Sequence, residues 1–329
     1  MKKEDLKIVF LGTPEFSVAS LDALVSAGYN VVAAVTMPDK RAGRGHALFQ
    51  SPVKQYAVSH NIPVLQPERL KDPEFLDSLR RYDADLFVVI AFRMLPREVW
   101  QMPRLGTFNL HASLLPRYRG AAPINRAVMN GDTFTGVTTF MLKHELDTGD
   151  VLCQERIDIG PDENVGSVHD RLMNLGARVT VETVGHILAG DIEPMPQEQI
   201  GGGLEPCQAP KIFREDCFID WTRPAREVHN FVRGLSPYPA AWCVLQGQTT
   251  PPAEVKIFAT AVAEGSAFGE PGQVAVEDGR MIVACGEGAV EILSLRPAGK
   301  KQMDARAYLL GARLAAPHMA LTMPDDKKK

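Results

Sequence analysis

The sequence has few cysteines, and none is placed for a structural role. The five cysteines of the 329-residue chain are scattered, and no two have CxxC spacing. A disulfide framework and a zinc site are therefore not expected, and we predict no metal. The chain also lacks an apolar run approaching the roughly 20 residues of a bilayer span, and its charged N-terminus has no signal-peptide pattern. We expect a cytoplasmic protein without membrane association.

Basic residues do not outnumber acidic ones in this chain. The chain carries 36 Lys and Arg against 40 Asp and Glu, a net charge of -4. A strongly basic chain would indicate a nucleic-acid partner. This balance neither supports nor excludes one, so any RNA contact must come from a local patch. The 45% hydrophobic and 23% charged residues are typical of a globular protein, and the length suits two domains.

The first 190 residues alternate between strand-like and helix-like segments. The apolar run Lys7–Gly12 ends in Gly-Thr-Pro, as a buried strand does when it turns into a helix. This alternation predicts a Rossmann-like α/β fold, with a mostly parallel sheet and helices on both faces. Further strands are expected at 31–36, 62–65, 85–91, 106–111, 137–142 and 151–159, and helices at 16–27, 52–60, 73–81 and 165–188.

The composition changes beyond the last of these helices. Residues 191–208 carry several prolines and three consecutive glycines with little periodicity, which is typical of a linker. Beyond them, short strands at 274–276, 281–284 and 290–295 are separated by turn residues and predict a small OB-like β-barrel. The predicted organisation is a domain at 1–190 that holds the candidate chemistry, the linker at 191–208, a C-terminal domain at 209–320 and a disordered tail at 321–329.

Two common site patterns are missing. The Gly-Thr-Pro turn after the first strand lacks the three-glycine fingerprint of dinucleotide folds, and the second strand, VVAAVT, ends without an acidic residue. A nicotinamide site is thus not expected, although the turn is suited to a ligand near a helix N-terminus. The chain has no GxSxG elbow, and neither Ser113 nor any cysteine has an obvious base beside it. Covalent catalysis is therefore not indicated.

The segment FNLHASLLPRYRGAAP, residues 108–123, places two polar side chains together on a strand. Alternation sends Asn109 and His111 to one face and Leu110 to the other. Burying such groups without partners would cost roughly 1–3 kcal/mol each, and ligands bind at the carboxyl ends of parallel strands. From these residues alone, a reaction centre and a simple capping of neighbouring loops are equally good interpretations.

Asp147 lies in the turn-rich loop HELDTGD between two expected strands. An aspartate in such a loop usually bonds to its own backbone in a turn, and composition alone favours that role. A histidine at a reaction centre would instead need an orienting carboxylate nearby. Asp147 is therefore the third candidate residue.

The combination of NLHASLLPRYRGAAP and LDTGD resembles the signature of the folate-dependent formyltransferases, and the similarity spans nearly the whole chain. The resemblance implies a catalytic trio of Asn109, His111 and Asp147. It also implies the donor 10-formyltetrahydrofolate. One segment departs from the family, because AFRMLP stands here where the family reads close to AYGxxLP, with Arg93 near the missing glycine. The residues that the resemblance assigns to the folate are Ser113, Leu114, Leu115, Pro116, Ala91 and Phe92.

Within that family, FLGTPEFS, MPDKRAGRGHALFQSPVKQYA and SLRPAGKKQM resemble the branch that acts on charged tRNA, as does WTRPAREVHNFVRGLSPYPAAW. The resemblance implies formylation of the methionine amino group on initiator tRNA, for translation initiation, by a monomer. It places Arg41, Arg44 and His46 against the tRNA. A second basic group in the C-terminal domain is a weaker candidate and comprises Lys211, Arg214, Arg223, Arg226 and Arg233.

Two other functions remain open at this point. One keeps the chemistry but takes a sugar-nucleotide amine as acceptor, and the AGRG and PAGKK segments argue against it. The other is a folate- or RNA-binding protein without catalysis. Retention of all three trio residues argues against this second alternative, because binding alone needs no group for proton transfer.

Overall fold

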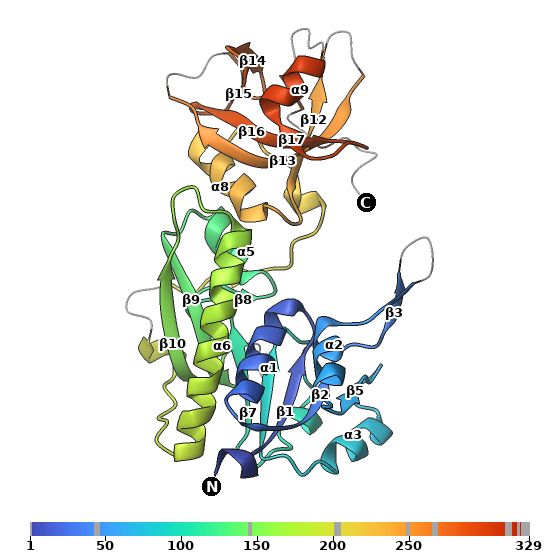
Figure 1. Cartoon of the computed structure of the whole chain (residues 1–329). Coiled ribbons are helices and arrows are strands. Elements are labelled where there is room, and N and C mark those ends of the chain that lie inside the picture. Colours follow the sequence, from blue (N-terminus) through green and yellow to red (C-terminus); the bar gives the residue numbers. More distant parts are fainter. Residues whose placement is uncertain are drawn as a thin grey trace. The chain divides into compact units, whose positions relative to one another are not determined.

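The structure is a computed structural model that describes residues 2–42, 47–143, 147–200, 205–247, 251–264, 269–312, 318–320 and 323. The chain forms two compact units, each built from stretches that are not contiguous in sequence (Figure 1). The N-terminal unit comprises Met1–Gly120, Gly136–Ile157 and Asp170–Gln208, and the C-terminal unit comprises Ala121–Thr135, Asp158–His169 and Ala209–Lys329.

A seven-stranded sheet forms the centre of the N-terminal unit. Side by side, its strands are β10 (Val151–Asp158), β9 (Phe134–Met141), β7 (Thr107–His111), β6 (Leu86–Ile90), β1 (Lys7–Gly12), β2 (Asn30–Val35) and β5 (Val64–Leu65). Strand β1 pairs in parallel with β2 and β6, and β6 with β7, whereas β9 runs antiparallel to β7. The predicted, mostly parallel α/β sheet is confirmed.

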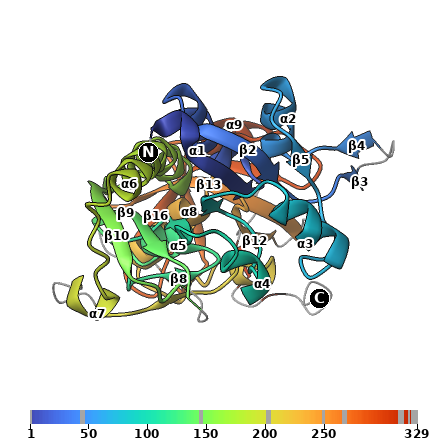
Figure 2. The ribbon, with the colours of Figure 1, turned by 90° about the horizontal axis from the view of Figure 1, so that it is seen from below.

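Helices cover both faces of this sheet (Figure 2). On one face, Val9 and Val89 pack into an apolar cluster with Phe75. On the other face, Gly176 lies so close to Leu110 that an added Cβ would be 2.7 Å from its Cδ2. The helices of the first face are α3 (Pro73–Arg80) and α4 (Arg97–Trp100), those of the second are α1 (Glu15–Ser26) and α6 (Val165–Ala189), and α2 (Pro52–Ser59) contacts α1.

Local sequence explains where α2 and α3 begin. The Ser51 hydroxyl accepts a hydrogen bond from the Lys54 backbone at 3.1 Å, and the Asp72 carboxylate accepts one from the Glu74 backbone at 3.0 Å. A proline follows each cap in the first turn, where its missing N–H leaves no helical hydrogen bond unmade.

A short hairpin follows β2 and extends away from the sheet (Figure 1). Strand β3 (Lys40–Ala42) pairs antiparallel with β4 (Ala47–Phe49), which places Arg41 opposite Leu48. The side chains of Leu48 and Phe49 are about three-fifths exposed, at 59% and 60%. Arg41 thus lies in β3, whereas Arg44 and His46 lie outside the described residues.

The C-terminal unit contains an antiparallel barrel, as predicted. In spatial order its strands are β14 (Val274–Glu277), β15 (Arg280–Ala284), β16 (Ala289–Pro297), β13 (Ala253–Val262), β12 (Ala241–Gln246) and β18 (His318–Met319), with β17 (Met303–Asp304) on β16. The two ends meet where the Met319 amide donates to the Gly272 carbonyl at 2.7 Å. Trp221 and Trp242 fill the core with α8 (Ala225–Leu235) and α9 (Ala305–Gly311).

Two stretches that precede residue 190 also belong to this C-terminal unit, so the unit boundary does not follow the predicted cut at that residue. Helix α5 (Pro123–Met129) packs on α8, and the Asn125 amide donates to the Gly234 carbonyl at 2.8 Å. From the same helix α8, Arg233 donates to the Glu163 carbonyl at 2.9 Å. Because Arg233 is only 6% exposed, its predicted place in a tRNA-binding surface is wrong, and it holds the unit together instead.

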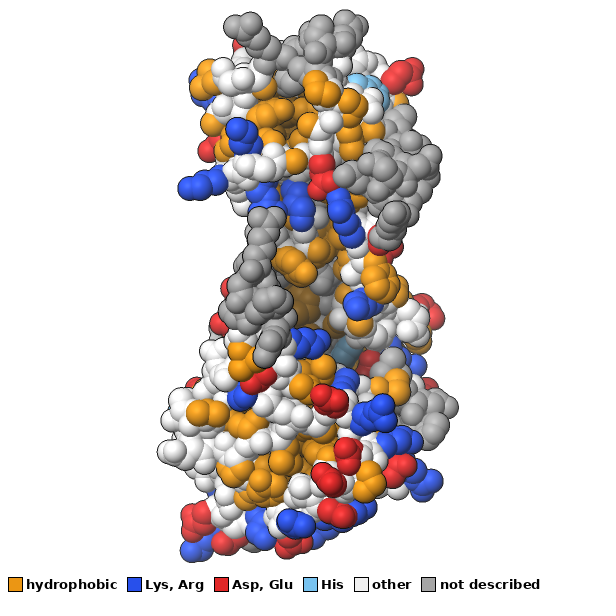
Figure 3. Space-filling view, turned by 90° about the vertical axis from the view of Figure 1, so that its right-hand side faces the viewer, with side chains coloured by type: hydrophobic (Ala, Val, Ile, Leu, Met, Phe, Trp, Pro, Cys, Tyr) orange, Lys and Arg blue, Asp and Glu red, His pale blue; other side chains and the backbone are white. Residues whose placement is uncertain are grey.

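The described helices include none that is both long and apolar enough to cross a membrane. The described residues also include no group of three or more His, Cys, Asp and Glu side chains suited to a metal ion. On the face of the N-terminal unit in Figure 3, basic and acidic side chains are interspersed with hydrophobic ones, in keeping with the small net charge. The remaining short elements are η1 (Lys3–Asp5), β8 (Arg119–Gly120), α7 (Gln197–Ile200), β11 (Gln208–Ala209) and η2 (Glu215–Cys217).

Candidate active site

Asn109 lies near the carboxyl end of β7, on the sheet face that carries the cavity. It pairs with Val89 of the parallel neighbour β6, and both residues line that cavity. The side chain is half-buried. Within the described part of the chain, no hydrogen bond engages its amide. A half-buried amide that faces a cavity in this way is available to a ligand, since buried polar groups are otherwise satisfied within the protein.

His111 follows on the same strand and is 7% exposed. Its Nε2 atom donates to the main-chain carbonyl of Tyr118 at 2.8 Å. Because a carbonyl only accepts, this bond places a proton on Nε2 and leaves Nδ1 as the nitrogen that gains or loses one. Nδ1 lies 3.9 Å from Oδ2 of Asp147, so the edge of the ring that does not bond to Tyr118 faces the carboxylate.

Asp147 is held in place by the backbone of another loop. Its Oδ2 accepts a hydrogen bond from the Gly120 amide at 3.0 Å, so its carboxylate reaches across the site and does not close a local turn. The residue is 8% exposed and has a φ of +54°, in the left-handed region that aspartate tolerates better than most residues. The structure therefore brings all three residues of the predicted trio together.

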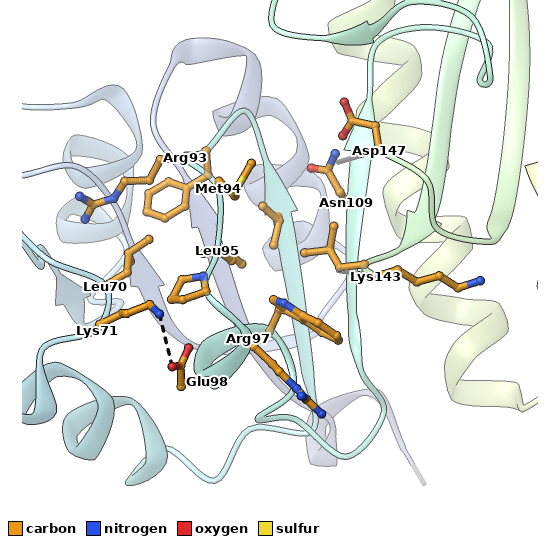
Figure 4. Close-up of a pocket in the computed structure, with 15 residues that line it drawn as sticks. Leu70, Lys71, Arg93, Met94, Leu95, Arg97, Glu98, Asn109, Lys143 and Asp147 are labelled. Carbon is orange, nitrogen blue, oxygen red and sulfur yellow. Dashed lines mark ion pairs between the residues drawn. The ribbon is translucent and has the colours of Figure 1, made fainter. Parts of the chain in front are cut away.

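A cavity of about 640 Å³ opens beside Asn109 and Asp147 (Figure 4). Asn109 and Asp147 lie next to each other at one end of it. Apolar side chains line much of its wall, and at its rim Lys71 pairs with Glu98 at 3.5 Å. A backbone hydrogen bond and the charge of Lys71 lower the pKa of Glu98. The other lining residues are Leu70, Val89, Phe92, Arg93, Met94, Leu95, Pro96, Arg97, Trp100, Leu142 and Lys143.

The family comparison agrees with this site. The family described as formyl transferase matches residues 6–184, and the one described as formyl transferase, C-terminal domain, matches residues 211–313. This chain belongs to the formyltransferase family. The two matches fall in the predicted N-terminal and C-terminal domains, and the polar trio lies within the first of them.

Relatives of this formyltransferase match it over nearly its full length. It is 56% identical to methionyl-tRNA formyltransferase of Bacteroides fragilis over 318 residues, covering 95% of this chain and 97% of the relative. The protein of the same name from Bacteroides thetaiotaomicron is 54% identical over 319 residues, covering 96% and 98%. The fold also resembles HypX from Aquifex aeolicus in complex with tetrahydrofolic acid, with a TM-score of 0.61 and 21% identity over 93% of this chain. This formyltransferase spans 47% of the HypX chain.

The loop assigned to the folate lies behind the trio and not on the cavity wall. Ser113 and Leu115 are fully or almost fully buried, at 0% and 1% exposure. The Thr138 hydroxyl donates to the Ser113 carbonyl and accepts from the Leu115 amide, and Gln154 donates to the Leu115 carbonyl. Of the residues predicted to contact the folate, Phe92 lines the cavity, whereas Ala91, Ser113, Leu114, Leu115 and Pro116 do not.

Arg93, the departure from the family pattern, fastens the cavity loop to a neighbouring loop. Its guanidinium donates to the carbonyls of Pro67 and Glu68, and it lies over the Phe92 ring at 5.6 Å. Burial lowers the pKa of this guanidinium. In Figure 4 its charged end points away from the cavity. This arginine therefore lines the cavity and also holds the backbone of its wall in place through its guanidinium.

Sequence reasoning missed the residues that support the trio. Thr138 and Gln154 hold the loop at 113–116, and Gln197 contacts the Asp147 loop from within the predicted linker. The strand period of 134–141 could have indicated Thr138 as an inward-facing residue. No local signal distinguishes Gln197, because it lies in a segment of linker composition.

Proposed function

We propose that this formyltransferase transfers a formyl group from 10-formyltetrahydrofolate to the α-amino group of methionine carried on initiator tRNA. The observation that carries the proposal is the trio of Asn109, His111 and Asp147 gathered beside the cavity. Relatives that are 54–56% identical over nearly the whole chain and are named methionyl-tRNA formyltransferase support the choice of acceptor.

The cavity fits a folate in size and chemistry. Pockets of roughly 300–1,000 Å³ with apolar walls and a few polar groups are typical of small-molecule sites, and this one has about 640 Å³. Phe92 and Trp100 offer apolar surface to a flat ring, while Lys71 and Arg97 at the same cavity offer positive charge to a carboxylate. The free amide of Asn109 lies at the end beside Asp147. The bound donor would supply the formyl carbon to be transferred.

The three side chains divide the work of acyl transfer. Asn109 donates its N–H to the formyl oxygen, on which negative charge develops as the amine attacks. Such a donor contributes about 10²–10³ in rate. His111 exchanges a proton through Nδ1, because its Nε2 is committed to Tyr118. The acceptor nitrogen loses one proton and the leaving nitrogen gains one, so no net proton is consumed. Asp147 stabilises the imidazolium, and such acid–base assistance contributes roughly 10²–10⁴.

The acceptor side of the proposal uses the segment after β2. Arg41 lies in β3 of the hairpin, and Arg44 and His46 follow it in sequence. Basic residues in this segment suit the phosphates of an RNA stem, which dominate nucleic-acid affinity. An amino-sugar nucleotide would have no need of such a hairpin. The protein requires no metal and acts as a monomer in this proposal.

One assay separates the alternatives. The purified protein is incubated with 10-formyltetrahydrofolate and either methionine-charged initiator tRNA or amino-sugar nucleotides, and formylated product is measured. Formyl-methionine on the tRNA is the expected result. Asp147→Asn should abolish most of the turnover, whereas Asp150→Asn, in the same loop, should retain it. Transfer only to the amino sugar, or binding of both substrates without transfer, would contradict the proposal.

A further inference from the structure

A buried glutamine lies beneath the Asp147 loop. Gln197 opens α7, between the two family matches, and is 1% exposed. Its Nε2 donates to the main-chain carbonyls of Asp147, at 2.7 Å, and of Gly149, at 2.9 Å. Its Oε1 accepts from Nε of Arg119 at 3.1 Å and from Nη2 at 2.6 Å. Both ends of the amide are therefore in use.

The partners of Gln197 allow a single orientation of its amide. A guanidinium can only donate, and a carbonyl can only accept. Rotating the amide by half a turn would place donors against Arg119 and an acceptor against the carbonyls of Asp147 and Gly149. The side chain therefore does more than fill space beneath the Asp147 loop. It fixes the position of this loop relative to Arg119.

The segment that carries Gln197 is itself attached to the sheet. The Val151 amide donates to the Met195 carbonyl at 2.8 Å, and the Met195 amide donates back to Val151 at 2.9 Å. Val151 is the first residue of β10, directly after the Asp147 loop. Gln197 therefore acts from an anchored position, and a shift of the loop would break contacts on both of its sides.

Both ends of the Gln197 amide contact segments that position the carboxylate of Asp147. Arg119 immediately precedes Gly120, whose amide donates to Oδ2 of Asp147. Gln197 thus connects the strand that holds the carboxylate to the loop that carries it. It also bonds to the carbonyl of Asp147, whose backbone has a φ of +54°, in the left-handed region.

We propose that Gln197 is a positioning residue for formyl transfer that acts through Asp147, holding its carboxylate near Nδ1 of His111. The inference rests on the proposed function, since it concerns the same reaction centre. It assigns a role in the reaction to a segment that lies outside both family matches. A misplacement of about 1 Å in a reacting group can cost about 10²-fold in rate, which is the scale of the expected effect.

The test compares Gln197→Met with Gln199→Met, an exposed glutamine of the same helix. Methionine keeps the length of the side chain but makes none of the four hydrogen bonds. We expect Gln197→Met to lower kcat by about 10- to 10²-fold with little change in KM for donor or tRNA. Gln199→Met should match the wild type. Equal kcat in both variants would overturn the inference.

A double-mutant cycle tests whether the effect passes through Asp147. In an Asp147→Asn background, measured as a residual single-turnover rate, Gln197→Met should cause little further loss. A full additional loss would show that Gln197 acts elsewhere and would reject the inference. If Gln197→Met does not fold, Arg119→Met replaces it, since this change removes both donors to Oε1 of Gln197 and keeps the Gly120 contact. A wild type without transfer activity would instead refute the proposed function.

Discussion

The imidazole of His111 is oriented by a main-chain carbonyl, because its Nε2 donates to Tyr118 over 2.8 Å. Tyr118 has a φ of +60°, so the direction of this carbonyl depends on an unusual loop conformation. The backbone, and not another side chain, selects the tautomer of the histidine. The nitrogen that remains for proton transfer is the one that faces Asp147.

His111→Gln should separate the two roles of the histidine. Glutamine places an N–H donor near the former Nε2 and so keeps a bond to Tyr118, but it has no group that exchanges a proton. We expect turnover to fall by about 10²–10⁴-fold with little change in Tm. His111→Ala should lose turnover and also melt at a lower temperature, because it removes a buried hydrogen bond to Tyr118. Single-turnover rates and thermal denaturation measure both effects. Near-normal turnover in His111→Gln would contradict the assignment.

Asn109→Ala should act on the reaction and hardly on the fold. The amide has no hydrogen-bond partner among the described residues, so its removal leaves none unpaired. Loss of the oxyanion donor is expected to lower kcat by about 10²–10³-fold, with Tm close to that of the wild type. Asn30→Ala, at an exposed position of β2, is the matched control. A variant that lost stability but kept its kcat would show that Asn109 has a structural role.

Arg44→Leu tests the acceptor side of the proposal. Removing one phosphate contact should raise KM for charged tRNA and reduce the salt dependence of that KM, because fewer counterions are released on binding. KM for 10-formyltetrahydrofolate should stay the same. Steady-state kinetics at several salt concentrations give both values, and an unchanged KM for the tRNA would exclude a contact by Arg44.

Buried His229 should make stability depend on pH. Burial is the main cause that lowers its pKa from 6.5, and nearby Arg233 and Arg226 act in the same direction, whereas a bond to Pro161 and the charge of Asp162 oppose them. Because the folded state binds this proton less readily than the unfolded state, stability is present above pH 6.5 and declines as the pH falls below it.

The wild type should therefore lose Tm as the pH falls below 6.5, and His229→Gln should lose less over the same range. Glutamine is uncharged at either pH and can still donate to the Pro161 carbonyl, the partner of the histidine Nε2. Thermal denaturation across this range measures the difference. Parallel Tm curves for the two proteins would mean that His229 does not carry the pH dependence.

The cysteines should differ in reactivity. Burial raises the pKa of Cys217 to about 11 and that of Cys285 to about 12, and it also raises the pKa of fully buried Cys243. Since the thiolate is the reactive form, these three should resist a thiol reagent at neutral pH. Only Cys153 and Cys207, which are partly exposed, should react in the folded protein. Mass spectrometry after labelling identifies the sites, and rapid labelling of Cys243 would contradict the structure.

The sequence predicted the sheet, and the shared strand face of Asn109 and His111, because both depend on local regularities. The period of two along β7 places Asn109 and His111 on one face, and the long apolar runs mark the parallel strands. The hydrogen-bond partner of the Asp147 carboxylate could not be predicted from such local patterns. Its carboxylate bonds to Gly120, which is distant in sequence, and the choice between a local turn and a remote contact is made by tertiary structure.

Other features were missed because their sequence signal is weak or misleading. Residues 191–208 have linker composition, yet Gln197 is buried and Met195 pairs with β10. Neither α5 nor α8 was predicted. Helix α5 is short, but Pro123 in its first turn was an available signal for the start of a helix. The grouping of α5 with α8 depends on packing between segments that lie far apart in the chain.

Because α5 packs with α8, the N-terminal and C-terminal parts of this enzyme cannot be exchanged independently between relatives. A gene fragment that encodes only residues 209–329 would lack α5 and the stretch Asp158–His169, and with them the partners of Gly234 and Arg233. Exchange of the C-terminal part between relatives would therefore have to carry three separate stretches of sequence together. Recombination at a single crossover point would leave α8 facing helix and loop residues with which it had not evolved.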